Sequence, residues 1–390
     1  MSVNILEKAK KIQDYVVELR RDFHRQPEPS FKEYRTSQRV KEELSKMGIK
    51  VESLGETGVV GILEGNTKGK VIALRADMDA LSITEETGLS FSSENPGFMH
   101  ACGHDCHTAM LLGAAKVLSG MKDSLKGTVK FIFQPAEEVA AGAKKIIEEG
   151  ALKNPDVDFI FGMHIWADTP IGKVILQEGP LMASGDIWDL EIKGKSSHGS
   201  APWQGVDSIV CAASVINGIQ TIVSRVNDVR SPIVINIGTI KGGERFNVTP
   251  GSTKIEGMNR AFSSYCRKNM PVWIEKVVKN ICTAYGCDYE FNYDFICGVT
   301  INDDEATKFT KKSIAKIVGE DGFMATEKIM GSEDFSEYLE SVPGALMLLG
   351  GKNDAKGCCY SHHSNYFDVD EDALPIGVAA YVQVSIDYLS

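Results

Sequence analysis

The sequence predicts an α/β protein in which helices flank a mixed, largely parallel sheet and a smaller α+β domain is inserted into the larger one. Short apolar, β-rich runs alternate with helical patterns in the first half of the chain. The rhythm changes near residue 186, and the α/β pattern returns near residue 304. With 390 residues, 43% of them hydrophobic, the chain is long enough to form more than one core.

The first part of the chain supplies the predicted sheet of the large domain. Apolar positions at helical spacing predict helices over residues 3–20, 34–48, 105–119 and 139–149. Apolar runs predict buried strands over residues 71–77, 128–134 and 158–165. Alternation of this kind is typical of a parallel sheet with helices on both faces, in which ligands gather beyond the carboxyl ends of the strands. Polar residues stand at all three of these ends: Asp77 and Asp79, the "QPAEE" run, and His164.

The segment after residue 186 follows another order: strand, helix, two strands, helix, strand. These elements are expected at residues 186–194, 204–224, 233–240, 252–262, 269–285 and 287–295. The βαββαβ order predicts a ferredoxin-like unit. A helix at 304–318, a strand at 345–351 and a final helix from about 373 then return to the first pattern. We therefore expect a large domain formed by residues 1–183 and 297–390, with residues 184–296 inserted.

Composition excludes several classes of partner. A net charge of −11 argues against nucleic acid, because phosphate binding needs a basic surface. The charged, amphipathic N-terminal stretch does not resemble a signal peptide, and no run of about eighteen apolar residues predicts a membrane span. Nine cysteines without a framework spacing indicate reduced thiols. We expect a cytoplasmic protein without a membrane partner.

The stretch "HACGHDCHTA", residues 100–109, concentrates three of the eight histidines of the chain. Histidines here could be ordinary surface or core residues. However, Cys102 and His104 stand two apart in a glycine-containing turn before a helix, and thiolate with imidazole is a ligand set for transition metals. A C-x-H pair alone is a weak signal, since structural zinc sites usually have a second pair nearby. Distant residues must complete such a site.

Further candidate ligands follow at the ends of the later strands. Glu137 and Glu138 could be solvated residues of a helix start, where acidic side chains are favourable. At the end of a buried strand, however, one carboxylate can bind metal while the other acts as a general base. His164 ends the next strand, where a polar ring needs a partner. Later candidates cluster after the last main strand: Cys358, Cys359, His362 and His363.

At this point the sequence resembles the M20 metallopeptidases, and within them the amidohydrolase branch of N-acyl-amino-acid, hippurate and indole-acetyl-amino-acid hydrolases. The resemblance covers nearly the whole chain. It runs through "LRRDFHRQPEPSFKE", "LRADMDALSI", "MHACGHDCHTAMLLGAA", "FIFQPAEE", "GMHIW", "GPLMASGD", "GKSSHGSAPWQGVDSI", "FNVTPG" and "HSNYFDVDEDALPIG". It implies a catalytic domain with two divalent metal ions and a small domain through which a homodimer or dimer of dimers forms.

The resemblance also implies roles for particular residues. The metal ligands it implies are Cys102, His104, Glu138, His164 and His363. Cys102 would bridge the two ions, which we expect to be Mn²⁺ or Zn²⁺, with Co²⁺ as a further candidate. The late pattern fits "HSNYF" with His363 as the ligand and His362 beside it, although Asn365 stands where the family pattern has proline. Glu137 would be the general base.

The small domain contributes the remaining predicted residues. The resemblance implies that His198, from the other subunit, stabilises the oxyanion, although its spacing alone also suits an exposed loop histidine. From the sequence alone, an ion pair on a strand surface is the better expectation for Arg260. The resemblance implies that Asn247 and Arg260 contact the carboxylate of the substrate, which a guanidinium can bind through two parallel hydrogen bonds. We expect Asp77, Asp79 and Asp105 to orient the ligands rather than to bind metal.

The predicted function is metal-dependent hydrolysis of the amide bond of small N-acyl amino acids. A dipeptidase or an N-acetyl-diaminopimelate deacetylase is the alternative within the family. A nucleotide-binding enzyme is disfavoured, because "GKS" at 194–196 lacks the upstream P-loop glycine, with Asp189 in its place. A non-catalytic metal-binding protein is the other rival, but it would not need the free carboxylate of Glu137 beside a metal ligand.

Overall fold

A computed structural model describes residues 4–390, which divide into two compact units. The large unit contains Met1–Gly179, Ile301–Glu327 and Asp334–Ser390, and the small unit contains Pro180–Thr300 and Lys328–Glu333. The segment 184–296, expected as an insertion, lies within the small unit. Residues 328–333 also belong to the small unit, which the sequence pattern did not predict.

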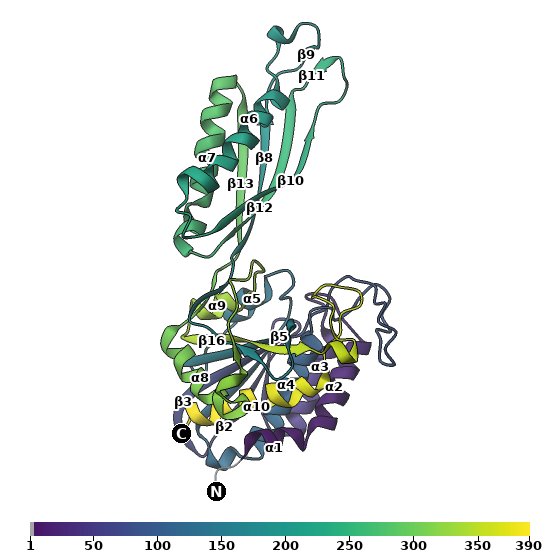
Figure 1. Cartoon of the computed structure of the whole chain (residues 1–390), viewed down its shortest axis with the longest axis vertical. Helices are drawn as coiled ribbons and strands as arrows, with labels where there is room; N and C mark the ends of the chain where they lie inside the picture. Colours follow the sequence, from purple (N-terminus) through teal and green to yellow (C-terminus); the bar gives the residue numbers. More distant parts are fainter. Residues whose placement is uncertain (1–3) are drawn as a thin grey trace. The chain divides into compact units, whose positions relative to one another are not determined.

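The large unit is built on an eight-stranded sheet with the order β1-β2-β4-β3-β5-β16-β6-β15 (Figure 1). The strands are β1 (Lys50–Leu54), β2 (Gly58–Glu64), β3 (Thr67–Asp77), β4 (Lys126–Gln134), β5 (Phe159–Pro170), β6 (Val174–Ile175), β15 (Phe323–Met324) and β16 (Gly344–Lys352). The central strands β4, β3, β5 and β16 are parallel, whereas β1, β2 and β6 add antiparallel pairs. This sheet confirms the predicted mixed, largely parallel fold.

Helices cover the sheet of the large unit and supply most of its apolar core. They are α1 (Ile5–Lys10), α2 (Gln13–Arg25), α3 (Tyr34–Lys46), α4 (His104–Ser119), α5 (Gly142–Glu148), α8 (Asp304–Val318), α9 (Phe335–Leu339) and α10 (Leu374–Tyr388). Helix α4 is buried along almost its whole length, and α2 packs on it through Val16, Leu19 and Phe23. Helix α4, which begins with His104, is therefore packed within the core of the large unit.

The small unit confirms the βαββαβ order. Its strands are β8 (Gly185–Lys193), β10 (Ile233–Gly242), β12 (Ser252–Ala261) and β13 (Asp288–Cys297), and its helices are α6 (Ser208–Thr221) and α7 (Ser264–Tyr285). The sheet order is β10-β12-β8-β13, with every pair antiparallel. A short ribbon accompanies this unit, in which β9 (Ser197–His198) pairs with β11 (Val248–Thr249). A second ribbon, in which β7 (Gly179–Met182) pairs with β14 (Thr300–Asn302), contains residues of both units.

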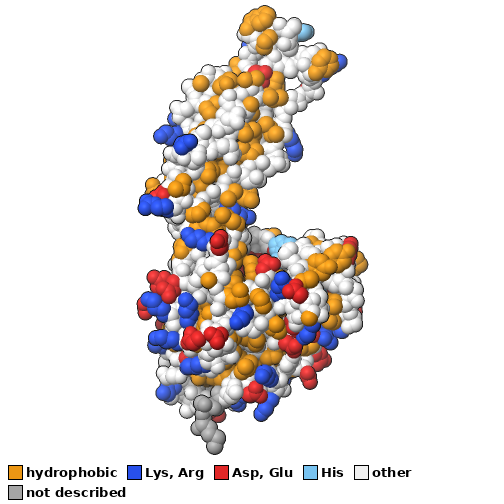
Figure 2. Space-filling view, viewed as in Figure 1, with side chains coloured by type: hydrophobic (Ala, Val, Ile, Leu, Met, Phe, Trp, Pro, Cys, Tyr) orange, Lys and Arg blue, Asp and Glu red, His pale blue; other side chains and the backbone are white. Residues whose placement is uncertain are grey.

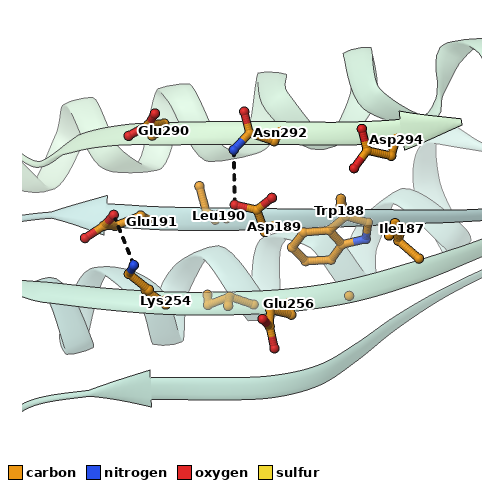
Figure 3. Close-up of a pocket in the computed structure, with 12 residues that line it drawn as sticks. Ile187, Trp188, Asp189, Leu190, Glu191, Lys254, Glu256, Glu290, Asn292 and Asp294 are labelled. Atoms are coloured by element: carbon orange, nitrogen blue, oxygen red, sulfur yellow. Dashed lines mark hydrogen bonds and ion pairs between the residues drawn. The ribbon is translucent and has the colours of Figure 1, made fainter.

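A groove runs over β8, β12 and β13 of the small unit, with a cavity volume of about 580 Å³ (Figure 3). Exposed carboxylates dominate its lining, and Lys254 is the only cation among the lining residues. Asn292 donates to Asp189, and Lys254 pairs with Glu191. None of the predicted catalytic or metal-binding residues lines this groove.

One helical segment of the described residues, Ser208–Val226, is long and apolar enough to meet the criteria for a membrane span, which corrects the expectation that no stretch would. Its inward face is buried against the small sheet. That face consists of Cys211, Ala212, Val215, Ile219 and Ile222. An amphipathic core helix of a globular domain meets the same criteria, which is why length and composition alone do not identify a span.

The structure also corrects several predicted elements. The helix expected over 3–20 is interrupted at Lys11 and Ile12, so that α1 and α2 are separate. The helix expected over 139–149 begins only at Gly142, because the chain after "QPAEE" first forms a turn. Strand β2 was not predicted. Neither were the shorter strands β1, β6 and β15, which have few residues over which an alternation could be recognised.

Candidate active site

Gly103 forms the turn that presents Cys102 and His104. It has a φ of +87° and lies at the N-terminal cap of α4. A Cβ atom at this position would lie 2.5 Å from a methyl carbon of Ile165. Glycine is therefore required both for the left-handed backbone and for the close approach to β5. The turn brings the cysteine and the histidine beside the end of that strand.

His104 is buried, and its two ring nitrogens have different surroundings. Nδ1 donates to the backbone oxygen of Asp79 at 2.9 Å, so the lone pair of the neutral ring lies on Nε2. Nε2 has no hydrogen-bond partner among residues 4–390. Burial alone would lower the pKa of His104, but the carboxylates of Asp77, Asp79 and Glu138 outweigh it and raise the pKa to about 10. The site is thus negative enough to hold a cation.

Asp79 and Glu33 hold the "QPAEE" turn after β4. Ala136 has a φ of +54° and donates its N–H to Glu33 at 2.9 Å. The N–H groups of Glu137 and Glu138 donate to the two carboxylate oxygens of Asp79, at 3.0 and 3.1 Å. Three consecutive amides are thereby fixed by buried carboxylates, and this fixes where the two glutamate side chains begin.

Both glutamate side chains approach His104. Its Nε2 lies 3.9 Å from Oε2 of Glu137 and 3.8 Å from Oε1 of Glu138. The Oε1 atom of Glu138 is buried and has no hydrogen-bond partner in the described part of the chain. Burial raises the pKa of Glu138 to about 7, in spite of the opposing effect of His104. A cation at this position would remove that cost of burial.

His164 lies on β5 with Nε2 3.4 Å from Sγ of Cys102. Its Nδ1 donates to the backbone oxygen of Ile165 at 2.6 Å, which leaves the lone pair of the neutral ring on Nε2. Burial lowers the pKa of His164 well below its ordinary value, and His107 and His362 lower it further. The ring is therefore neutral, as a metal ligand must be.

His362 and His363 differ in what their rings contact. Nε2 of His362 accepts from the N–H of Ala167 at 3.1 Å, so its lone pair is already used. His363, with a φ of +64°, instead has Nε2 3.6 Å from Oε2 of Glu138. It also lies in a cluster with Cys102 and Glu138. This geometry favours His363 as the late candidate ligand.

The candidate ligand atoms form two groups that share a thiol. The first contains Cys102, His104 and His164, and the second contains Cys102, Glu138 and His363. Within each group the atoms lie within 4.8 Å of one another. Each group offers soft and nitrogen donors of the kind that bind zinc and other transition metals. The arrangement would offer ligands to two cations, and Cys102 belongs to both groups.

The other buried histidines of the motif lie outside these two groups. His107 is engaged at both ring nitrogens, by Asp77 and by the N–H of Ile165. The ring nitrogens of His100 have no hydrogen-bond partner among the described residues, and burial lowers the pKa of the ring to about 4. Asp105, expected to orient a ligand, instead accepts hydrogen bonds from Arg20 and His24.

The three predicted residues of the small unit are not all close together. His198 and Asn247 lie side by side, since Val248 pairs with His198 and Gly199 donates to the backbone of Asn247. Arg260 lies near the opposite end of β12, where it pairs with Val234. The eight steps along the strand from Ser252 to Arg260 span about 26 Å, at roughly 3.3 Å per residue.

Two features of the site were not predicted. Glu33 binds the N–H of Ala136 and the hydroxyl of Thr57, and Ser30 donates to Asp79 at 2.6 Å. Both lie in "LRRDFHRQPEPSFKE", whose role the sequence did not reveal. The available signal was the place of this stretch among the family motifs together with its carboxylates, because the groups that orient metal ligands are often carboxylates.

The sequence of the chain is similar to those of known hydrolases. Residues 73–387 match the family model "Peptidase family M20/M25/M40". Thermostable carboxypeptidase 2 of Saccharolobus solfataricus is 40% identical over 97% of both chains. An N-acyl-L-amino acid amidohydrolase of Geobacillus stearothermophilus is 42% identical over 74% of this chain and 78% of its own.

Solved structures agree with these relatives. The Bacillus subtilis YXEP protein, a dinuclear metal-binding peptidase from the M20 family, has a TM-score of 0.85 and 35% identity, over 97% of this chain and 99% of its own. The family model spans most of the chain, and the relatives cover both units. The chain therefore belongs to peptidase family M20 and is a metallo-amidohydrolase, as its sequence predicts.

Proposed function

We propose that this enzyme hydrolyses the amide bond of N-acyl amino acids at two divalent metal ions. The proposed ligands are Cys102, His104, Glu138, His164 and His363. The observation that carries this proposal is the pair of ligand groups that share Cys102. The lone pairs of His104 Nε2 and Glu138 Oε1, both buried without a hydrogen-bond partner in residues 4–390, support it. Thiolate and imidazole favour Mn²⁺, Zn²⁺ or Co²⁺ over a hard ion such as Mg²⁺.

Glu137 is the proposed general base. When bound, such ions lower the pKa of a water molecule and polarise an amide carbonyl. The Glu137 carboxylate takes a proton from the attacking water and delivers it to the nitrogen of the leaving amino acid. Its backbone is held by Asp79, and its side chain is nearly buried beside His104. These contacts keep the carboxylate close to the ligands.

His198 is proposed to donate a hydrogen bond to the oxyanion in the active site of a second subunit. The N–H of Ser200 donates to Nδ1 of His198 at 3.1 Å, so the neutral ring has its proton on the exposed Nε2. A donor pointing outward suits this role. Since Arg260 lies about 26 Å along β12 from Ser252, which closely follows this ribbon in the chain, we infer that one small unit does not bring both His198 and Arg260 to the same small substrate molecule.

The surface around the β9–β11 ribbon supports a homodimer or a dimer of dimers. Figure 2 shows hydrophobic side chains gathered at the end of the small unit that carries this ribbon. Phe246 is 94% exposed and Trp203 is 78% exposed. Large apolar side chains that are exposed in one chain commonly bury in contact with another. In the proposed assembly, Asn247 and His198 come from one chain and Arg260 from the other.

The substrate class follows from the proposed carboxylate contacts. Arg260 and Asn247 would bind the carboxylate of the amino acid, and the acyl group would extend away from it. The relative named as a carboxypeptidase favours peptides as a second substrate class. The nine cysteines have no framework spacing, and the reduced thiols that this indicates support the proposed cytoplasmic location.

The proposal is tested with metal-free protein. After treatment with a chelator, Mn²⁺, Co²⁺, Zn²⁺ or Mg²⁺ is added back, and release of amino acid is measured from N-acetyl, N-benzoyl and indole-acetyl amino acids. Dipeptides and N-acetyl-diaminopimelate form the comparison arm. We expect activity to need a transition metal, with about two ions per chain, and to favour the acyl amino acids. Full activity without metal would overturn the proposal.

A further inference from the structure

The peptide of Ile165, next to His164, lies where β5 loses one neighbouring strand. The pairing of β3 with β5 ends at Arg75 and Gly162, whereas β16 continues along β5 to Pro170. Beyond Gly162 one edge of β5 therefore has no strand beside it. Backbone groups buried at such an edge need other partners, because an unpaired buried N–H or C=O is costly.

Two imidazole rings provide those partners. The N–H of Ile165 donates to Nε2 of His107 at 2.7 Å. The C=O of Ile165 accepts from Nδ1 of His164 at 2.6 Å. The ring planes of the two histidines are nearly perpendicular, with centroids 4.6 Å apart. One residue of the strand is thus held at both of its backbone groups by side chains.

His107 has no free nitrogen in this arrangement. Since Nε2 accepts from Ile165, the proton of the neutral ring is on Nδ1, which donates to Asp77 at 2.5 Å. Arg75 in turn donates to Asp77 at 2.6 Å, and all three side chains are fully buried. Although His107 lies in a cluster with Asp77 and His104, both of its nitrogens are already used.

We propose that His107 is a positioning residue that sets the direction of His164 through the Ile165 peptide. The inference rests on the proposed function, since His164 is a ligand only if the metal pair is bound. His107 fixes the peptide plane through the N–H, and the C=O of the same residue holds Nδ1 of His164. The lone pair on Nε2 of His164 consequently points toward Cys102, 3.4 Å away.

The role predicts an order among three substitutions at position 107. Phenylalanine keeps an aromatic ring of similar size but offers neither hydrogen bond. Asparagine can reproduce the Nδ1 donor to Asp77, whereas glutamine can place an acceptor near the position of Nε2. Because the proposal depends on the bond to Ile165, metal affinity should fall in the order wild type, His107→Gln, His107→Asn, His107→Phe. Partners that orient a ligand typically contribute ~10- to 100-fold in metal affinity.

Metal binding is measured by titrating metal-free protein with Zn²⁺ against a chromophoric chelator. For His107→Phe we expect one of two sites to weaken by ~10- to 100-fold and the other to change little. Thr108→Val is the matched control, because Thr108 is buried beside His107 and donates only to the backbone oxygen of Asp77. It should bind both ions as wild type does. Thermal unfolding of the metal-free variants establishes that each is folded.

The outcomes separate this inference from the proposed function. Wild-type protein that binds no transition metal overturns the proposed function. Wild-type protein that binds two ions, together with a His107→Phe variant of equal affinity, overturns the positioning role. If the phenylalanine variant does not fold, the glutamine and asparagine variants decide, and asparagine binding as tightly as glutamine would contradict the role. In wild type, ¹⁵N chemical shifts of His107 should also be the same with and without Zn²⁺, whereas a change at Nε2 would make His107 a ligand.

Discussion

The carboxyl edge of the large sheet and the β9–β11 ribbon of the small unit place their histidines in opposite environments. His104, His107 and His164 are buried, and each has at least one ring nitrogen held by a defined partner. His198 is exposed, and only its Nδ1 is held, by Ser200. The first group is oriented before any ligand arrives. The exposed Nε2 of His198 points to solvent. It can donate to a reacting group only if another surface packs against the ribbon.

The two regions differ in what fixes the geometry of their histidines. At the sheet edge, the partners of the candidate ligands are backbone groups and carboxylates of the same unit, so the ligand set is preorganised. At the ribbon, the flanking side chains Trp203 and Phe246 are exposed, and nothing within the small unit completes the surroundings of His198. The ligands at the sheet edge are held within one unit, whereas His198 is proposed to act with a second chain. The two regions can therefore be tested separately.

The largest effect is expected at the sheet edge, from the two adjacent glutamates. Glu137→Gln should lower kcat by ~10²- to 10⁴-fold while metal content stays near that of wild type, because a general base is lost and no ligand is. Glu138→Gln should lose both activity and metal. Elemental analysis and steady-state kinetics of the purified variants measure the two quantities. Near-normal turnover in Glu137→Gln would mean that another group takes the proton.

The two late histidines provide the next test of the same region. His363→Ala should lose metal affinity and with it most of the activity, because its Nε2 faces Glu138. His362→Gln should keep both ions, since glutamine can still accept from the N–H of Ala167. Competition with a chelator gives the affinities. Equal losses of metal affinity in the two variants would contradict the assignment of His363, rather than His362, as the ligand.

The ribbon is tested by mixing two inactive proteins, His198→Ala and Glu137→Ala. If His198 acts in a second subunit, a mixed dimer has one centre with both groups and one with neither. With random exchange half of the dimers are mixed, so about a quarter of wild-type activity should return, given a closed two-fold dimer. A histidine that acts in its own chain restores no activity. Mass spectrometry of differently labelled chains verifies that subunits have exchanged.

The smallest effect concerns the stability of the network behind the sheet edge. The carboxylate of Glu85 pairs with His24. Burial alone would raise the pKa of Glu85, but hydrogen bonds from His24, Thr87 and the N–H of Ser93 lower it to about 2. A carboxyl with a lowered pKa stabilises the fold above its ordinary pKa of about 4.5, and this contribution disappears as the pH falls toward 2.

Glu85→Gln should therefore reduce the free energy of unfolding at neutral pH by about 2 kcal/mol, after allowance for solvent screening. The difference from wild type should shrink below pH 4.5 and vanish near pH 2. Chemical denaturation of metal-free protein at several pH values measures it. Glu86→Gln is the control, because Glu86 is exposed, and it should change stability by less than about 0.5 kcal/mol. A pH-independent difference at position 85 would argue against the ionised pair.

Much of the architecture could be predicted because its signals are local. The buried strands β3, β4 and β5 are continuous apolar runs, and the βαββαβ order of the small unit follows from the spacing of its elements. The break between α1 and α2 could not be predicted, since both helices share one apolar periodicity. Nor could the late start of α5, which depends on Glu33 and Asp79 holding the preceding turn.

For the site itself, the sequence is enough to name the set of donor atoms, because residue type is a property of each position. It does not place all of them at strand ends: His164, expected to end its strand, lies within β5, which continues to Pro170. Only the tertiary structure decided which histidines keep a lone pair for a ligand. The ring centroids of His107 and His362 lie 4.6 and 5.2 Å from that of His164, yet the N–H groups of Ile165 and Ala167 occupy their Nε2 atoms. Those partners lie 58 and 195 residues away along the chain. A ring nitrogen becomes donor or acceptor according to the group opposite it, and that group is brought there by the fold alone.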